Sequence, residues 1–115
     1  MADCIFCKIA SKEISSTTVF EDDRVIAFRD LDPKAPEHVL IIPKKHISNL
    51  NDLTAVDKDL VSHIFVDVLP KIVSDLKINE SGYRVVINTG DEGGQTVHHL
   101  HFHILGGRSM TWPPG

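Results

Sequence analysis

The chain has 115 residues, of which 42% are hydrophobic and 24% are charged, and its formal net charge is −4. This length suits one domain, residues 1–115, with a single core. The only basic run, residues 44–46, is too short to form the basic face typical of nucleic-acid-binding proteins. No apolar run is long enough to cross a membrane and no secretory signal is present. We therefore expect a cytoplasmic protein with neither nucleic acid nor membrane as partner.

The hydrophobic pattern predicts a short helix, a long helix and several strands. Residues 4–10 are expected to form a short helical turn that presents apolar side chains for packing. Strands are expected at residues 17–21, 24–29, 38–43, 83–88 and 99–105. Because the connections within each group of strands are short, antiparallel pairing is favoured and the fold class is α+β.

Apolar residues recur at a spacing of four between Val56 and Leu76, which indicates a long amphipathic helix. Thr54 and Asp57 resemble a capping box at its start, with Asp in place of the preferred Glu or Gln. Pro70 falls inside this segment, and a proline within a helix removes a backbone donor and kinks or splits the helix. We expect one helix kinked near Pro70, with two separate helices as the alternative.

Three histidines, His99, His101 and His103, alternate with apolar residues near the end of the chain. In a strand they share one face, while the apolar residues between them enter the core. A neutral imidazole is a competent nucleophile near pH 7 because its unperturbed pKa is about 6.5. It can attack phosphorus and form a covalent linkage, while a second histidine protonates the leaving group. The stretch is therefore a candidate catalytic site, although a polar strand face or a simple metal patch would show the same pattern.

A glycine-rich loop, residues 89–96, leads directly into the histidines. Its backbone N–H groups can approach a phosphate closely, and Gln95 and Thr96 add side-chain donors. It is not a Walker A motif, because no Gly-Lys-Ser/Thr ends it. Taken alone, the loop fits an ordinary hairpin connection. Its position next to the histidines favours a phosphoryl site.

The two cysteines form a Cys4-x-x-Cys7 motif. In a reducing compartment a structural disulfide is disfavoured, which leaves metal binding, redox chemistry or inert thiols. A thioredoxin-type motif expects a preceding strand, and only three residues precede Cys4. The spacing alone does not decide between a metal site and free thiols.

The chain resembles the histidine-triad (HIT) superfamily in its histidine stretch, residues 99–105, preceded by Gly-Gln-Thr-Val at residues 94–97. Its ending, residues 106–115, is similar to that of the Hint branch, the nucleoside phosphoramidate hydrolases. The resemblance implies a HIT-like fold with a five-stranded antiparallel sheet and a homodimer joined into a ten-stranded sheet. It also implies hydrolysis of the P–N bond of purine nucleoside 5′-phosphoramidates through a covalent nucleotidyl-histidine.

The resemblance also assigns roles to individual residues. His101 would be the nucleophile, His103 would contact the phosphate and assist proton delivery to the leaving amine, and His38 would support the nucleophile. Asp30 would take the ribose hydroxyls. The residues expected around the rest of the nucleotide are Ile5, Phe6, Phe28, Leu31, Asn88, Gly94, Gln95, Thr96, Val97 and Trp112. For Ile5, Phe6, Phe28 and Leu31 plain core packing is the competing interpretation, and for Asp30 it is a loop cap.

Bacterial members of the superfamily bind zinc through two cysteines and two histidines, which correspond here to Cys4, Cys7, His46 and His99. Two thiolates and two imidazoles make a closed tetrahedral site, whose zinc is structural and not catalytic. We therefore expect a structural zinc ion and no organic cofactor.

Two other functions fit parts of the sequence. One is a Fhit-like dinucleoside polyphosphate hydrolase, which the Trp-Pro-Pro-Gly ending disfavours. The other is a nucleotide-binding regulatory or scaffold protein without significant turnover. Trp112 and the two prolines that follow it further suggest a stiff arm that reaches the partner's active site in a dimer.

Overall fold

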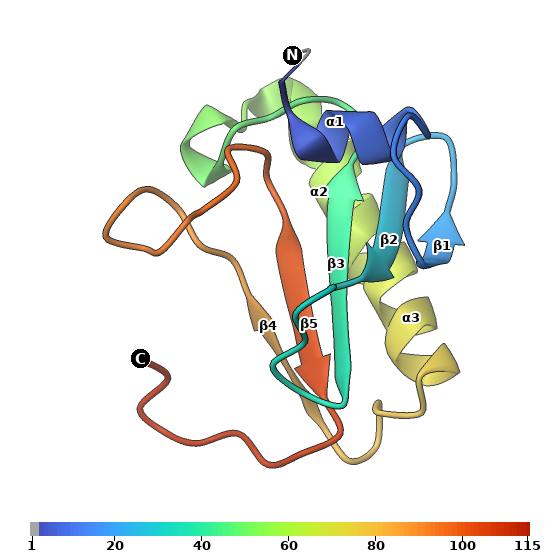
Figure 1. Ribbon diagram of the computed structural model, residues 1–115, viewed down its shortest axis with the longest axis vertical. Helices are drawn as coiled ribbons and strands as arrows, with labels where there is room; N and C mark the ends of the chain where they lie inside the picture. The colour runs from blue at the N-terminus through green and yellow to red at the C-terminus, as the bar shows by residue number, and fades with distance from the viewer. Residues whose placement is uncertain (1–2) are drawn as a thin grey trace.

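A computed structural model describes residues 3–115 and shows a single five-stranded sheet in the order β1-β2-β3-β5-β4 (Figure 1). The strands are β1 (Thr18–Glu21), β2 (Val25–Arg29), β3 (Glu37–Pro43), β4 (Tyr83–Val86) and β5 (Phe102–Gly106). Every neighbouring pair runs antiparallel. The predicted α+β class and the antiparallel sheet are confirmed. No helix within residues 3–115 has both the length and the apolar composition that a membrane crossing requires.

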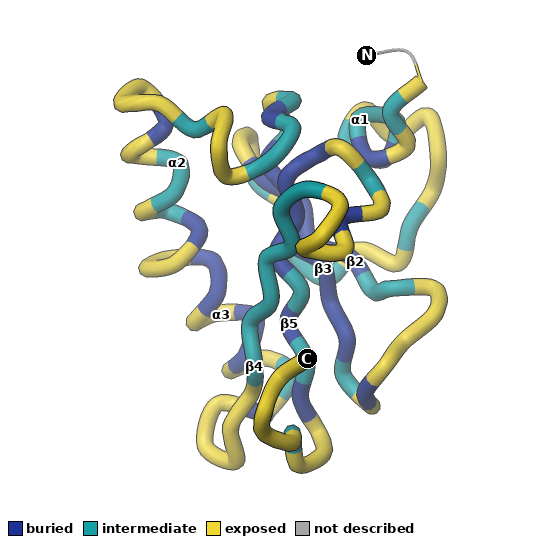
Figure 2. The backbone as a smooth tube through the Cα atoms, turned by 90° about the vertical axis from the view of Figure 1, so that its left-hand side faces the viewer, coloured by how far each residue is buried: buried dark blue, intermediate teal, exposed yellow. Residues whose placement is uncertain are grey.

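The sheet separates two apolar clusters, one on each face. On one face, alternate residues of the central strands pack against the long helix; they include Val25, Ala27, Val39, Ile41, Phe102 and Ile104, against Ile64, Val68 and Ile72. On the other face, the intervening residues Ile26, Phe28, Leu40 and Ile42 pack against Phe6 and Ile9 of α1 (Ile5–Ala10). The central strands β2 and β3 are buried along most of their length (Figure 2).

The long helix is continuous but changes its hydrogen-bonding pattern ahead of Pro70. After a 3₁₀ turn, α2 (Lys58–Ser62) passes into a π-helical segment (His63–Val68) and then into α3 (Leu69–Asp75). Pro70 stands in the first turn of α3, where its missing donor is tolerated. The predicted irregularity is therefore real, and it takes the form of a π segment that precedes the proline. The predicted capping box is present, with the Asp57 carboxylate accepting from the Thr54 N–H at 3.0 Å.

The apolar residues of the histidine stretch follow the prediction, whereas the expected strand is shorter. Leu100, Phe102 and Ile104 are buried in the helix-side cluster. The ladder begins only at Phe102, because the backbone N–H of Leu100 donates to the carbonyl of Ile47 at 2.6 Å, outside the sheet. His99 thus precedes the ladder, but its ring still lies on the predicted face, on the α1 side near Phe6 and Cys4. His103 remains on β5, opposite Leu40 of β3.

His63 joins the long helix to the turn between β1 and β2. Its Nε2 lies 2.6 Å from the Asp22 carboxylate and its Nδ1 lies 2.9 Å from the Asp67 carboxylate. These hydrogen bonds, with Asp22 first, raise the pKa of His63 above its usual value. Nothing in the local sequence indicated this role, because Asp22 lies 41 positions away along the chain.

Replacing His63 with Gln should therefore destabilise the protein in a pH-dependent way. A histidine with a raised pKa stabilises the folded state fully below its unfolded pKa, and this stabilisation disappears as the pH rises through the folded value. We expect a loss of about 1 kcal/mol near pH 5.5 and a much smaller loss near pH 9. Urea unfolding of both proteins at the two pH values measures the difference. Lys71→Gln, which removes an exposed ion pair with Asp75, is the control, and an effect of His63→Gln that is equal at both pH values contradicts the prediction.

Candidate functional site

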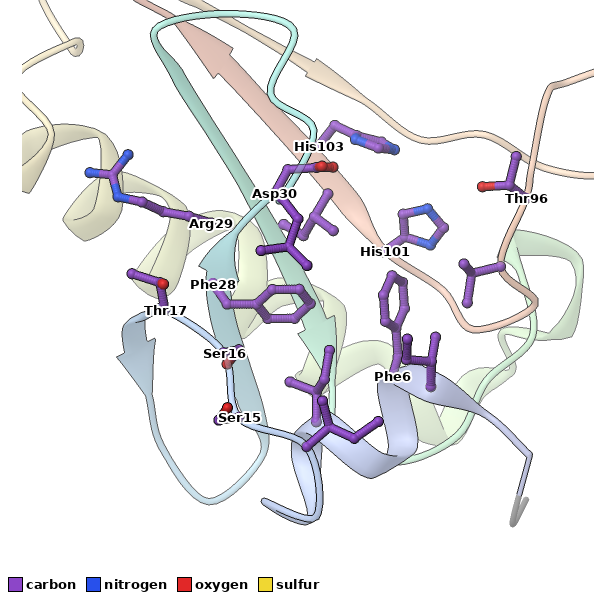
Figure 3. Close-up of a pocket in the computed structure, with 16 residues that line it drawn as sticks. Phe6, Ser15, Ser16, Thr17, Phe28, Arg29, Asp30, Thr96, His101 and His103 are labelled. Atoms are coloured by element: carbon purple, nitrogen blue, oxygen red, sulfur yellow. The ribbon is translucent and has the colours of Figure 1, made fainter.

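A cavity of about 260 Å³ opens on the α1 side of the sheet, between α1, the end of β2 and the segment that leads into β5 (Figure 3). Predicted site residues that line it are Ile5, Phe6, Phe28, Asp30, Leu31, Thr96, Val97, His101 and His103. One end is apolar, with Phe6 and Phe28 packed edge to face at 5.7 Å between ring centres. The other end carries the imidazoles and the Asp30 carboxylate, so the cavity is apolar at one end and polar at the other.

The segment between α1 and β1 also contributes to the cavity wall, through Ser15, Ser16 and Thr17 (Figure 3). Sequence reasoning did not identify these hydroxyl residues, nor Arg29 at the end of β2. A short polar run before a strand looks like an ordinary connection, so only the folded chain shows that it borders a cavity.

Four predicted nucleotide-binding residues do not line the cavity: Asn88, Gly94, Gln95 and Trp112. Gln95 is buried, and its side-chain amide donates to the carbonyls of Ser48 at 2.7 Å and Val97 at 3.1 Å. Its oxygen accepts from the N–H of Gly90 at 3.0 Å. Gln95 therefore holds the glycine-rich loop in shape, in place of the expected donor role toward a phosphate. Trp112 is 81% exposed in the single chain.

His101 is buried with one nitrogen committed to the backbone. Its Nδ1 lies 2.7 Å from the carbonyl oxygen of His99, and a carbonyl can only accept, so Nδ1 carries the proton. The Nε2 lone pair of the neutral ring is then free. Phe6 packs edge to face against the ring at 5.0 Å, which fixes its orientation beside the cavity. This arrangement suits a nucleophilic nitrogen.

His103 lies beside His101, with 5.0 Å between the ring centres, and is hydrogen bonded to His38. The backbone N–H of Lys34 donates to Nδ1 of His38 at 3.0 Å, so neutral His38 carries its proton on Nε2. That nitrogen donates to Nδ1 of His103 at 3.0 Å, which leaves the His103 proton on Nε2. Asp30 completes the group, with its carboxylate 3.6 Å from Nε2 of His38.

The imidazole rings of His103 and His38 are both neutral at physiological pH. Burial, together with the neighbouring His101 and His38, lowers the pKa of His103 to about 4. Burial also lowers the pKa of His38, against the opposing effect of Asp30. The site therefore holds neutral imidazoles with defined protons.

The four predicted metal ligands lie together behind the cavity. The ligand atoms of Cys4, Cys7, His46 and His99 all lie within 4.8 Å of one another. The Nδ1 of His99 is 3.3 Å from the Cys4 sulfur, and the Nδ1 of His46 is 3.2 Å from the Cys7 sulfur. Tetrahedral zinc with ordinary bond lengths separates sulfur and nitrogen ligands by about 3.5 Å. The spacing of these side chains therefore fits a zinc ion.

The position of the proton on the His99 ring also favours metal binding. Its Nε2 lies 2.8 Å from the carbonyl oxygen of Pro43 and donates to it, so Nδ1 is unprotonated and faces the thiols. A second group, Asp30, His38 and His103, is equally compact. There, however, Nδ1 of His38 accepts the Lys34 N–H, so the inward Nε2 is protonated and cannot ligate. The first group is suited to a metal and the second to a hydrogen-bonded chain.

The sequence and the fold both match known proteins. The HIT domain family pattern matches residues 11–110. The chain is 50% identical to a 14 kDa zinc-binding protein of Zea mays over 96% of this chain and 87% of that protein. It superposes with a TM-score of 0.95 on the crystal structure of a HIT family hydrolase from Legionella pneumophila, at 51% identity over 98% of this chain and all of that one.

A more distant structure adds a second description. The histidine triad nucleotide-binding protein of Candida albicans superposes with a TM-score of 0.82 at 36% identity, over 96% of this chain and 83% of that chain. The histidine stretch, the metal-ligand group and the five-stranded sheet thus occur together with a family match over most of the chain. The chain belongs to the HIT domain family.

Proposed function

We propose that this protein is a nucleotide-binding hydrolase that cleaves the P–N bond of purine nucleoside 5′-phosphoramidates. The observation that carries the proposal is the free Nε2 of His101, fixed by the His99 carbonyl and set beside the neutral His103. The names of the similar Legionella and Candida proteins, a hydrolase and a nucleotide-binding protein, support the class of activity.

The shape of the cavity supports a nucleoside monophosphate as the bound unit. Phe6 and Phe28 offer apolar surface for a purine, with Ile5, Leu31 and Val97 around them. Asp30 adds a carboxylate at the polar end of the cavity, where it can accept from ribose hydroxyls. Thr96 lies beside His101 and offers a hydroxyl to the phosphate (Figure 3).

The proposed reaction has two displacements at phosphorus. Nε2 of His101 forms a bond to phosphorus while the P–N bond breaks, and the leaving nitrogen takes up a proton that His103 relays from solvent. Water then attacks phosphorus and gives up a proton to solvent, while the bond from phosphorus to Nε2 of His101 breaks; this releases the nucleoside monophosphate and restores the neutral His101. The His38 Nε2–H holds His103 in the tautomer that presents its own N–H to the phosphoryl group.

We further propose that Cys4, Cys7, His46 and His99 bind a structural zinc ion. The support is the ligand spacing and the proton arrangement of His99, together with the zinc-binding relative from Zea mays. Zinc in this closed site would hold α1 to the segment that carries the histidines. All four protein ligands are needed to complete it, so it would supply structure and leave the phosphoryl chemistry to the imidazoles.

We also propose a homodimer in which the outer edge of β4 pairs with a second copy, forming a ten-stranded sheet. β4 is a terminal strand with one unpaired edge, and such edges are normally covered. The tail runs next to this strand, where Arg84 of β4 donates to the Thr111 carbonyl at 2.9 Å (Figure 1). Trp112, exposed in the single chain, would be covered in the dimer and would border the partner's cavity.

A substrate panel tests the proposed function. Adenosine and guanosine 5′-phosphoramidates, pyrimidine analogues and dinucleoside polyphosphates are compared under steady-state conditions. We expect purine phosphoramidates to give the highest kcat/KM, because the apolar end accepts a purine and the histidine pair acts on phosphorus. Higher kcat/KM for dinucleoside polyphosphates would favour a polyphosphate hydrolase, and binding without turnover would favour a regulatory protein.

The same panel, extended with phosphoramidates of different amines and run on a chain ending at Ser109, tests the role of the tail. Removing residues 110–115 should change the ranking of leaving amines more than the ranking of bases, because the tail is proposed to border the leaving-group side. Sedimentation of both proteins shows whether the dimer persists. An unchanged amine ranking in a persisting dimer contradicts the proposed position of Trp112.

A further inference from the structure

The exposed side chain of Arg108, just beyond β5, reaches across to the loop between β2 and β3. Its Nε and Nη2 both donate to the carbonyl oxygen of Lys34, at 3.1 and 2.9 Å. Its remaining terminal nitrogen donates to the carbonyl of Ser109 at 3.1 Å, so all three nitrogens have partners. A planar guanidinium held at each nitrogen fixes the position of the loop relative to the tail.

The residue before Arg108 shows independently that the tail and this loop are closely fitted. Gly107 has a φ of +89°, which favours glycine, and a Cβ at this position would lie 2.9 Å from the Cβ of Pro36. The backbone of the tail therefore passes directly against the loop. The close approach of Gly107 places Arg108 within reach of Lys34.

The same loop residue sets the proton on His38. The Lys34 N–H donates to Nδ1 of His38, and this contact requires the neutral ring to carry its proton on Nε2, the nitrogen that also faces the Asp30 carboxylate at 3.6 Å. Without that donor, the proton can occupy either nitrogen, and the hydrogen bond from His38 to His103 is no longer guaranteed. Arg108 and His38 thus hold opposite ends of one residue, through its carbonyl and its N–H.

We propose that Arg108 is a positioning residue that fixes the tautomer of His38 and, through it, the orientation of His103. Arg108 does not line the cavity, so it acts only through the Lys34 backbone. The structural part of this proposal concerns the free protein. Its consequence for turnover rests on the proposed function.

Nitrogen NMR of the histidine side chains tests the structural part without any substrate. Spectra are recorded near pH 8, where the imidazoles are neutral. In the wild type, His38 should give the signals of the Nε2–H form and His101 those of the Nδ1–H form. In Arg108→Ala the His38 signals should move to a mixture of tautomers, while those of His101 stay in place. Arg108→Lys, which keeps one donor group but not the planar fork, should give a smaller shift in the same direction.

Arg84→Gln is the matched control, because it removes the other arginine that anchors the tail without touching the loop. Its His38 signals should match those of the wild type. Unchanged His38 signals in both Arg108 variants overturn the proposal, and so does an equal shift in Arg84→Gln, which would mean that any loosening of the tail has this effect. Backbone amide spectra confirm that each variant remains folded.

Turnover supplies the second measurement. Arg108→Ala should lower kcat by about tenfold, since part of the proton-transfer assistance is lost, and should change KM less than about twofold. A wild type without turnover on any phosphoramidate contradicts the proposed function but leaves the NMR result to decide the role of Arg108. A tautomer mixture with unchanged kcat would overturn the catalytic part alone.

Discussion

Replacing His101 with Ala should abolish phosphoramidate turnover, lowering kcat/KM by about 10⁴- to 10⁶-fold, which is typical when an enzyme loses its nucleophile. The expected loss of kcat/KM is this large because His101 is the nucleophile. Its Nδ1 donates to the His99 carbonyl, so its Nε2 is the nitrogen with a free lone pair at the cavity. His103 cannot replace it, since its Nδ1 is occupied by His38 and its Nε2 carries the proton. Intact-protein mass spectrometry of a rapidly quenched reaction should show one nucleotidyl group on the wild type and none on the variant.

Two further variants make this result specific. His101→Asn keeps a donor for the His99 carbonyl but has no nucleophilic nitrogen, so it should be as inactive as His101→Ala. His98→Ala changes an exposed histidine three positions earlier that does not line the cavity, and should retain turnover. Wild-type turnover in His101→Ala, or a nucleotidyl group attached to another residue in that variant, would show that the nucleophile has been misassigned.

Local patterns in the sequence were sufficient for the framework of the site. The alternation of Leu100, Phe102 and Ile104 correctly predicted which side chains enter the core, because a strand's period of two determines the faces locally. His99 follows the same alternation, because its ring lies on the α1 side with Phe6 and the two cysteines. The alternation did not predict that the ladder starts only at Phe102, since the contact of Leu100 with Ile47 joins segments far apart in sequence.

Features that depend on distant parts of the chain could not be predicted from local patterns. The pairing of His63 with Asp22 and the clamp of Arg108 on Lys34 join elements that only the fold brings together. Gln95 illustrates a second reason. An amide next to a glycine-rich loop is equally able to bind a phosphate or its own loop, and only the positions of Ser48 and Val97 decide between them.

The metal-ligand group and the nucleophile are physically connected through two paths. His99 contributes its ring to the metal group and its carbonyl to the Nδ1 of His101. Cys4 is the N-cap of α1, where its sulfur accepts from the Cys7 N–H at 3.4 Å, and the helix carries Phe6 against the His101 ring. Loss of the metal should therefore affect the position of the nucleophile as well as the stability of the fold.

Removal of the metal is accordingly expected to lower both thermal stability and turnover. Protein purified without added metal should hold about one zinc per chain. Zinc binding stabilises the folded state, so its removal lowers the free energy of unfolding. A decrease of about 3 kcal/mol would lower the Tm of a domain of this size by more than about 10 °C. Turnover should fall with it and return when zinc is added back. Amide hydrogen exchange should accelerate in α1 first, because two of the four ligands hold that helix.

Cys7→Ser separates the metal from other effects of a chelator. This variant should have the lower Tm already in the absence of chelator, and chelation should lower it no further, because the site is incomplete. Equal Tm losses for wild type and variant would show that the chelator acts elsewhere. Metal analysis that finds no zinc in freshly reduced wild-type protein would remove the proposed site. If zinc is present but its removal leaves turnover unchanged, then the two paths from His99 and Phe6 do not control the His101 ring, and the site stabilises only the fold.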